Sequence, residues 1–211
     1  MPRPIDHDGQ VPDFTAITPN ALAALVADRA NELSGFAVIA VEGADAADPM
    51  AFAVAVAELL HTTGRPAEVV ALHDFVRPAS VRLEFDREDE FTYRTGWFDY
   101  AALNREVLEP LRKSGRWLPA LWNERADRSA RARIRTALPG TILLVAGPML
   151  LGRGLRFDFT VGLRMSEAAL RRHTEERARF TIAPILAQQE LETPDVLVAW
   201  DHPNRPAVRA G

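Results

Sequence analysis

The chain has 211 residues, of which 47% are hydrophobic and 26% are charged, and its formal net charge is −4. This composition is typical of a globular protein long enough to bury one sizeable core. The lack of cysteine excludes disulfides, thiolate metal sites and cysteine nucleophiles. The small negative charge gives no general attraction to nucleic acids or acidic membranes, and no stretch approaches the roughly 20 apolar residues of a membrane span. We therefore expect a cytoplasmic protein with no nucleic-acid or membrane partner.

The first part of the chain predicts a helix, a strand, a second helix and a second strand, in that order. Residues 1–17 contain several prolines and are expected to form an irregular lead-in. Thr18 and Pro19 combine a hydroxyl cap with proline at the first helical position, which predicts a helix up to Gly35. The elements expected next are a buried strand at 36–42, a helix at 51–63 and a strand at 68–72.

The second part of the chain continues the same alternation. The further elements are a helix at 100–113 that begins at Asp99, strands at 141–147 and 157–163, a helix at 166–179 and a strand at 195–200. Continuous apolar strands that alternate with helices are typical of a parallel sheet with helices on both faces. We predict a single three-layer α/β domain over residues 1–211. Ligands of such sheets bind where the strands end, which singles out Gly43, His73, Asp74, Gly147 and Asp201.

The loop from Gly43 to Met50 follows the first strand and precedes a helix, as a phosphate-binding loop does. The pattern of such loops is G-x-x-x-x-G-K-[ST]. Only Gly43 matches it, because Asp48, Pro49 and Met50 stand where the second glycine, the lysine and the hydroxyl residue are expected. Pro49 supplies no cation and no N–H, and Met50 offers no oxygen to Mg²⁺. Asp48 and Pro49 instead form a good helix start.

The charges of this loop oppose a bound phosphate chain. The Asp48 carboxylate is expected to accept the N–H groups of residues 50 and 51, which would otherwise face phosphate, and Asp45 adds a second negative charge. Like charges about 4 Å apart repel by roughly 4 kcal/mol at an effective dielectric constant near 20. We therefore expect ATP to bind poorly. The alternatives are a loop that binds nucleotide through other cations, a loop that serves another ligand, and a plain strand-to-helix turn.

The order of several segments resembles the uridine kinase and phosphoribulokinase group of P-loop kinases over about residues 36–206. The segments that resemble this family are 36–43, 72–78, 97–99, 145–148, a segment beginning at Asp158, and 201–206. The resemblance implies a nucleoside kinase-like fold. It also implies an ancestral transfer of phosphate from Mg-ATP to a nucleoside hydroxyl.

The resemblance also implies roles for individual residues. In the family, the first acid of the motif D-D-F takes the proton from the substrate hydroxyl, and here that position is His73, followed by Asp74. The acid of the family's V-E-G motif is replaced by Ala146. The side chains expected around the substrate are Trp97, Phe98, Asp99 and Trp122. Those expected in a lid are Arg171, Arg172 and Arg177. Residues 114–136 are a candidate lid or substrate insertion. No metal-binding cluster is predicted.

Each of these residues has a simpler interpretation. His73 could act as a general base at neutral pH or lie in a surface turn. Asp99 could hold a ribose or only cap the helix that follows it. The tryptophans could pack in the core. The lid arginines could pair with neighbouring glutamates, and the arginine-rich run 125–135 could be a solvated face.

Our principal hypothesis is a uridine kinase-like protein that has lost the usual ATP binding and phosphate transfer. It would remain as a small-molecule-binding or regulatory pseudokinase, with a nucleoside or a phosphorylated small molecule as its ligand and no cofactor. The alternative is an active nucleoside kinase that uses Mg-ATP, with His73 as base and arginines in place of the lysine. A structural or interaction protein, such as a homodimer, is the third hypothesis.

Overall fold

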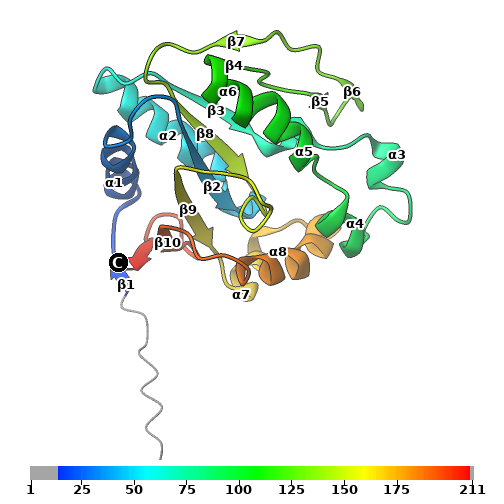
Figure 1. Cartoon of the computed structure of the whole chain (residues 1–211). Coiled ribbons are helices and arrows are strands. Elements are labelled where there is room, and N and C mark those ends of the chain that lie inside the picture. The colour runs from blue at the N-terminus through cyan, green and yellow to red at the C-terminus, as the bar shows by residue number, and fades with distance from the viewer. Residues whose placement is uncertain (1–13, 210–211) are drawn as a thin grey trace, which may run out of the picture.

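The computed structural model describes residues 14–209, and these form one seven-stranded sheet in the order β1-β11-β10-β9-β2-β8-β3 (Figure 1). The strands are β1 (Phe14–Ala16), β2 (Ala37–Gly43), β3 (Ala67–Ala71), β8 (Ile142–Gly147), β9 (Phe159–Arg164), β10 (Val196–Ala199) and β11 (Ala207–Arg209). The five strands from β10 to β3 are parallel, and β11 and β1 add an antiparallel edge. The predicted α/β class with a largely parallel sheet is therefore confirmed.

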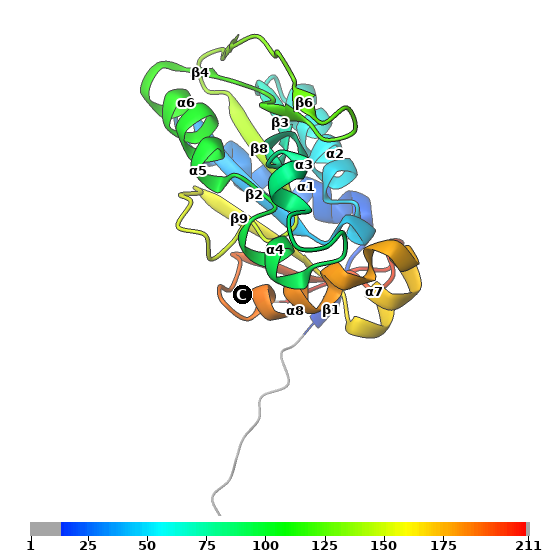
Figure 2. The same ribbon diagram turned by 90° about the vertical axis from the view of Figure 1, so that its right-hand side faces the viewer.

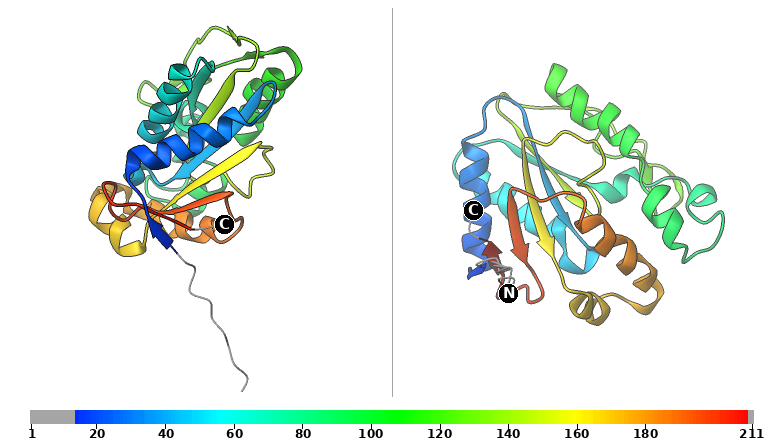
Figure 3. Two further views of the ribbon diagram at one scale, coloured as in Figure 1. Left: turned by 90° about the vertical axis from the view of Figure 1, so that its left-hand side faces the viewer. Right: turned by 60° about the horizontal axis from the view of Figure 1, so that its bottom comes forward.

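Helices cover both faces of this sheet. One face carries α1 (Pro19–Asn31) and α2 (Pro49–Thr62), and the other carries α4 (Glu90–Thr95), α8 (Ile182–Gln189) and the helical run from Tyr100 to Ser114 (Figures 1 and 3). The central strands β2 and β8 are buried along their whole length. This double burial explains why their sequences are continuously apolar instead of alternating.

The predicted helix starts are present, because each has a side chain that satisfies a free N–H group. The Thr18 hydroxyl accepts from the N–H of Ala21 at 3.2 Å, and Asp99 accepts from Ala102 at 2.8 Å. Ser166 caps α7 (Glu167–His173) in the same way. These caps lie in the local sequence and could be recognised there.

The helical run from Tyr100 to Ser114 matches the predicted helix but changes its winding in the middle. It consists of α5 (Tyr100–Leu103), the π-helical turn η3 (Asn104–Leu108) and α6 (Glu109–Ser114). Pro110 has no N–H to donate to the carbonyl four residues earlier, at Glu106. That carbonyl accepts instead from Leu118 N–H at 2.9 Å and holds β4 (Arg116–Trp117) against the helix.

Residues 114–136 contain two short ribbons. They pair β4 with β7 (Arg135–Thr136) and β5 (Trp122–Asn123) with β6 (Arg128–Ser129). In Figure 2 the ribbons lie at the top of the molecule, and α7 and α8 lie at the bottom. The role of this segment as a lid or substrate insertion stays a prediction. The short helix α3 (Ala79–Arg82) follows β3.

Three predicted elements need correction. Residues 14–16 of the expected irregular lead-in form the edge strand β1, whereas residues 1–13 lie outside the described part of the chain. The helix predicted over 166–179 ends at His173, because Thr174 takes an extended conformation with ψ near 128°. A 3-10 helix, η4 (Glu176–Thr181), follows and leads into α8, which the sequence analysis missed. The strand predicted over 157–163 begins two residues later than expected, at Phe159.

Candidate functional site

The loop between β2 and α2 lies at the carboxyl edge of the parallel strands. At Gly43, where β2 ends, a Cβ atom would lie 3.1 Å from Leu163 Cβ, so a side chain here would crowd β9. The short 3-10 helix η1 (Asp45–Ala47) follows, and α2 begins at Pro49. The predicted order of strand, glycine-opened loop and helix is confirmed.

The loop satisfies several of its own N–H groups. Ala47 N–H donates to the carbonyl of Ala44 at 2.8 Å, and Asp48 N–H donates to that of Asp45 at 3.0 Å. Of the two N–H groups predicted to donate to the Asp48 carboxylate, that of Ala51 does so at 3.1 Å. Asp48 has a φ of 49°, a left-handed conformation that glycine adopts most easily and that Asp tolerates. Groups that would otherwise be free to bind an anion are thus engaged within the loop.

His73 joins this loop to the segment 114–136. It lies in η2 (Leu72–Phe75), directly after β3. Its Nε2 is 2.9 Å from Asp45 Oδ1, and its Nδ1 is 2.9 Å from Glu124 Oε2. The side chain is 38% exposed, so this bridge lies at the rim of the site. Both ring nitrogens are therefore occupied by carboxylates.

The two carboxylates keep the His73 ring protonated. Burial lowers the pKa of His73, but hydrogen bonds to Asp45 and Glu124, together with their charges, outweigh burial and raise the pKa from 6.5 to about 10. A protonated imidazole has no lone pair with which to take a proton. The neighbouring Asp74 has its pKa raised by burial, which the charge of His73 partly opposes. In this arrangement His73 is a cation between two acids, and its predicted role as a base would require it to lose that proton.

Small residues at the end of β8 allow the bridge to form. β8 lies between β2 and β3 in the sheet, so His73 reaches Asp45 across its end. A Cβ atom on Gly147 would lie 2.5 Å from Leu72 Cβ, so only glycine lets η2 approach this closely. Ala146, which stands where the family has an acid, is buried and places no charge there.

The charged network continues from Glu124 to a buried arginine. Arg82 donates from Nη1 to Glu124 Oε1 at 2.9 Å and from Nε to the Arg77 carbonyl at 2.7 Å. The Arg82 guanidinium also lies 4.9 Å from the centroid of the Trp97 ring. Sequence reasoning missed both Arg82 and Glu124 as site residues. The only signal was the position of the acid Glu124, directly before the arginine-rich run 125–135.

The side chains predicted to surround a substrate each have partners within the protein. Phe98 is 2% exposed and Trp97 is 9% exposed, and both pack against other aromatic rings. Asp99 caps α5, and Trp122 donates from Nε1 to Asp127 at 3.0 Å. None of the four side chains lines the cavity that contains Asp45 of the loop after β2. Their substrate roles stay predictions.

The predicted lid arginines lie on and after α7. Arg171 pairs with Glu167 at 2.7 Å and Arg177 with Glu175 at 2.8 Å, whereas Arg172 is an exposed residue of α7. A cavity of about 310 Å³ separates this segment from the loop after β2. Its lining includes Asp45 on one side and Arg177 on the other. The structure therefore brings one of the three arginines to the loop.

A second buried ion pair that the sequence did not predict stabilises the same edge. Glu42, the residue before Gly43, is 2% exposed and pairs with Nη1 of Arg164 on β9. Its other oxygen accepts from Leu151 N–H at 2.6 Å, which fixes the loop after β8. This carboxylate holds β2, β9 and that loop together.

Residues 14–209 contain neither a metal-binding cluster nor a membrane-spanning helix. No group of three His, Asp or Glu side chains there is placed to hold a metal ion. No helix in the same range has the length and apolar character needed to cross a membrane. The predicted lack of a metal site and the cytoplasmic location stay predictions.

Comparison with known proteins identifies the fold. No family model matches the chain, and no curated protein sequence matches it. A solved structure described as a possible uridine kinase from Bacillus stearothermophilus is similar with a TM-score of 0.67 and 16% identity, over 83% of this chain and 96% of that one. A candidate fructose transport system kinase from Silicibacter sp. TM1040 is similar with a TM-score of 0.61 and 19% identity, over 86% and 98% of the two chains. The chain therefore has the fold of the P-loop kinases.

Proposed function

We propose that this protein is a uridine kinase-like pseudokinase, which does not bind Mg-ATP in the usual way and is retained to bind a small molecule or to regulate. The observation that supports this most directly is the internal closure of the loop after β2. Asp45 pairs with His73, and Asp48 caps α2. Both acids of the loop are thus bound to groups of the same chain, which leaves the loop closed toward a phosphate.

The charge balance of the loop supports the same conclusion. Phosphoryl transfer depends on cations that neutralise the β- and γ-phosphates. In this loop a lysine is replaced by Pro49, two carboxylates are present, and the nearest cation in the described structure, His73, is shared between Asp45 and Glu124. An incoming phosphate chain would have to break this pair and face both acids. We expect that exchange to be unfavourable.

The cavity between the loop and η4 is the best candidate for the retained ligand site. Its volume of about 310 Å³ is at the lower end for small-molecule sites, which begin at about 300 Å³. Arg177 and His173 supply donors at its lining, Asp45 and Glu175 supply carboxylates, and Ile185 supplies an apolar surface. Of the two predicted ligands, a nucleoside matches this mixed chemistry better than a phosphorylated small molecule, because the two carboxylates would repel a phosphate group.

Calorimetry with Mg-ATP tests the proposal. We expect no binding by the wild type at millimolar ATP. We expect binding at least roughly tenfold stronger for the triple variant Asp48→Gly, Pro49→Lys, Met50→Ser. The control Asp28→Asn, on the exposed side of α1, removes one negative charge away from the loop and should leave the affinity for Mg-ATP unchanged. Micromolar affinity of the wild type for Mg-ATP would refute the proposal.

The same protein preparations test the alternative, an active kinase. A wild type that transfers phosphate to uridine, and loses this activity in His73→Ala, would establish His73 as the base. If the wild type shows no transfer while a thermal-shift screen of nucleosides and sugar phosphates detects a ligand, the pseudokinase is supported, because stabilisation by a ligand requires no reaction.

A further inference from the structure

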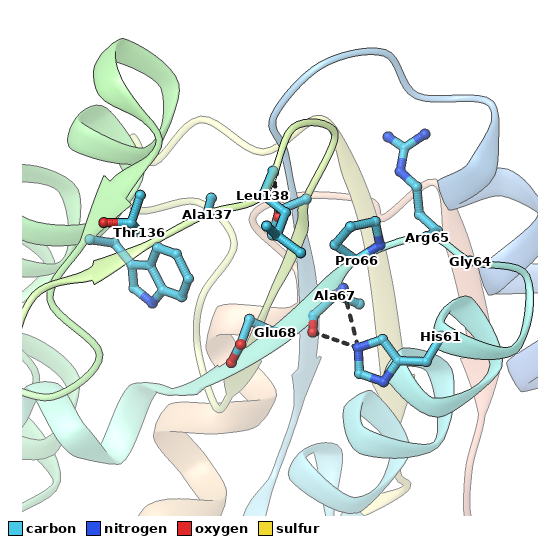
Figure 4. Close-up of a pocket in the computed structure, with 11 residues that line it drawn as sticks. His61, Gly64, Arg65, Pro66, Ala67, Glu68, Thr136, Ala137 and Leu138 are labelled. Carbon is cyan, nitrogen blue, oxygen red and sulfur yellow. Dashed lines mark hydrogen bonds between the residues drawn. The ribbon is translucent and has the colours of Figure 1, made fainter.

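Most charges of the arginine-rich run 125–135 have no ionic partner. The last of its arginines, Arg135, pairs with Glu68 at 2.6 Å. Glu68 lines a cavity of about 280 Å³ at the amino edge of the sheet, opposite the loop after β2, together with Arg65 and Trp117 (Figure 4). The other arginines of the run are exposed and form no ion pair within residues 14–209: Arg125, Arg128, Arg131 and Arg133. We call residues 125–133 the basic segment.

A second exposed segment, between α3 and α4, carries the opposite charge. We call residues 84–90 the acidic segment. Four of its acids are exposed and form no ion pair in the described part of the chain: Glu84, Asp86, Glu88 and Glu90. A further acid, Asp89, caps α4 by accepting from Thr92 N–H at 2.7 Å. Among these acids, Phe85 is 73% exposed. Exposed aromatic rings of this kind are enriched at protein interfaces.

The two segments lie on the same side of the molecule. Asp127 of the basic segment accepts from Ala79 N–H at 2.8 Å, which attaches the β5–β6 ribbon to α3. The acidic segment follows directly after α3, and in Figure 2 the elements β6, α3 and α4 follow one another from top to bottom. None of the ion pairs within residues 14–209 connects the two segments. Each is therefore available to a complementary surface of another molecule.

A second copy of this chain supplies both charges in matching number. Under two-fold symmetry the basic segment of each copy meets the acidic segment of the other, so the same contact forms twice. Isolated exposed ion pairs stabilise little, but the ring of Phe85 adds an apolar surface on which a guanidinium can stack. A nucleic acid fits this side less well, because the acidic segment beside the arginines would repel its phosphates.

We propose that this chain forms a two-fold dimer in which the basic segment of each copy binds the acidic segment of the other. The arginines of one copy pair with the carboxylates of the second copy, and the same guanidinium groups cover Phe85. Because these groups are exposed before they pair, salt screens their attraction and should weaken the dimer. The dimer does not depend on the function proposed for the loop after β2, and its test requires no ligand.

Analytical ultracentrifugation of the full chain tests the proposal. We expect a monomer–dimer equilibrium with a dissociation constant in the micromolar range. Raising the NaCl concentration from about 0.05 M to about 0.5 M should weaken the dimer at least roughly tenfold. Assembly should stop at the dimer, because a two-fold contact uses both segments of each copy. This salt series needs only the wild type, so it does not depend on whether a variant folds.

Charge reversal identifies the surfaces that pair. The double variant Arg125→Glu, Arg133→Glu gives a chain that is acidic in both segments, and Glu84→Arg, Glu88→Arg gives one in which arginines predominate in both. Each variant alone should dimerise at least roughly tenfold more weakly than the wild type. An equimolar mixture of the two should form a heterodimer, because every contact in it joins opposite charges.

A matched control and several outcomes decide the question. The variant Arg156→Glu, Arg205→Glu reverses two exposed arginines outside both segments and should dimerise like the wild type. A wild type that stays monomeric at about 100 µM, or a mixture of the reversed variants that stays monomeric, would overturn the proposal. Assemblies that grow beyond the dimer would contradict the two-fold arrangement. Binding of a glutamate-rich peptide by a monomeric wild type would assign the arginines to a different acidic protein.

Discussion

At the carboxyl edge of the sheet, ion pairs join segments that are far apart in the sequence, whereas at the amino edge Arg65 forms no ion pair among residues 14–209. His73 connects Asp45 to Glu124 at the first edge. Trp117 and Arg65 each have a buried donor without a partner at the second, and Arg164 has one at the first in addition to its ion pair. The edge at which open α/β sheets usually bind their ligands is thus closed by ion pairs within the chain itself.

This difference has an energetic consequence. Side chains that satisfy one another stabilise the fold together, so the loss of one leaves a buried charge or donor unpaired. A group that already lacks a partner leaves nothing unpaired when it is removed. Substitutions at the carboxyl edge should therefore cost more stability than substitutions of the unpartnered donors.

The largest effect is expected at the buried ion pair of Glu42 and Arg164. The change Glu42→Gln removes the charge that balances Arg164, whose side chain is only 14% exposed. We expect a loss of about 3 kcal/mol in the free energy of unfolding, because breaking a buried pair on one side typically costs 3–5 kcal/mol. Urea unfolding measures it, with Glu58→Gln on the exposed side of α2 as the matched control. A loss equal to that of the control would show that this edge does not depend on its internal pairs.

A smaller effect is expected from the protonation of His73. Its pKa is raised from 6.5 to about 10 in the folded protein, so its contribution to stability is fully present below pH 6.5 and is lost as the pH rises through about 10. Because the pair is partly exposed, we expect the free energy of unfolding to fall by only about 1 kcal/mol over this window. Thermal unfolding at a series of pH values measures the fall.

The change His73→Gln should remove this part of the pH dependence. The exposed His202→Gln should leave it intact, and the difference between the two curves cancels groups that titrate in both proteins. An NMR titration of His73 gives a direct check. A midpoint near 6.5 would mean that the two carboxylates do not hold the proton, and would restore His73 as a candidate base.

The helix starts and the central strands could be predicted from the sequence, because each depends on residues that are close together in the chain. Thr18, Asp48 and Asp99 each precede a helix whose first N–H groups they satisfy, so short segments suffice to place these starts. The strands β2 and β8 could be predicted in the same way, because burial on both faces gives each of them a continuous apolar run that a short stretch of sequence shows. The position of the loop after β2 followed from these elements.

The contacts that define the site could not be predicted, because they depend on the order of strands in the sheet. Asp45 and His73 are 28 positions apart and meet only because β8, which lies between β2 and β3, ends in small residues. Arg82 reads as an ordinary helix residue, yet it is buried against Glu124, 42 positions away. The edge pair β1–β11 joins residues near the two ends of the chain, and three-residue strands carry no usable periodicity.

The smallest effect is expected at Trp117, although it is among the most buried aromatic residues. Trp117→Phe removes an N–H that has no partner in the described structure, and this gain offsets part of the cost of filling the same space with a smaller ring. We expect a change within about 1 kcal/mol in urea unfolding. Trp122→Phe, which breaks the bond to Asp127, should cost at least as much although Trp122 is more exposed. A large loss of stability for Trp117→Phe would indicate that the indole N–H has an acceptor in solution, and Trp117 would then no longer count among the unpartnered donors of the amino edge.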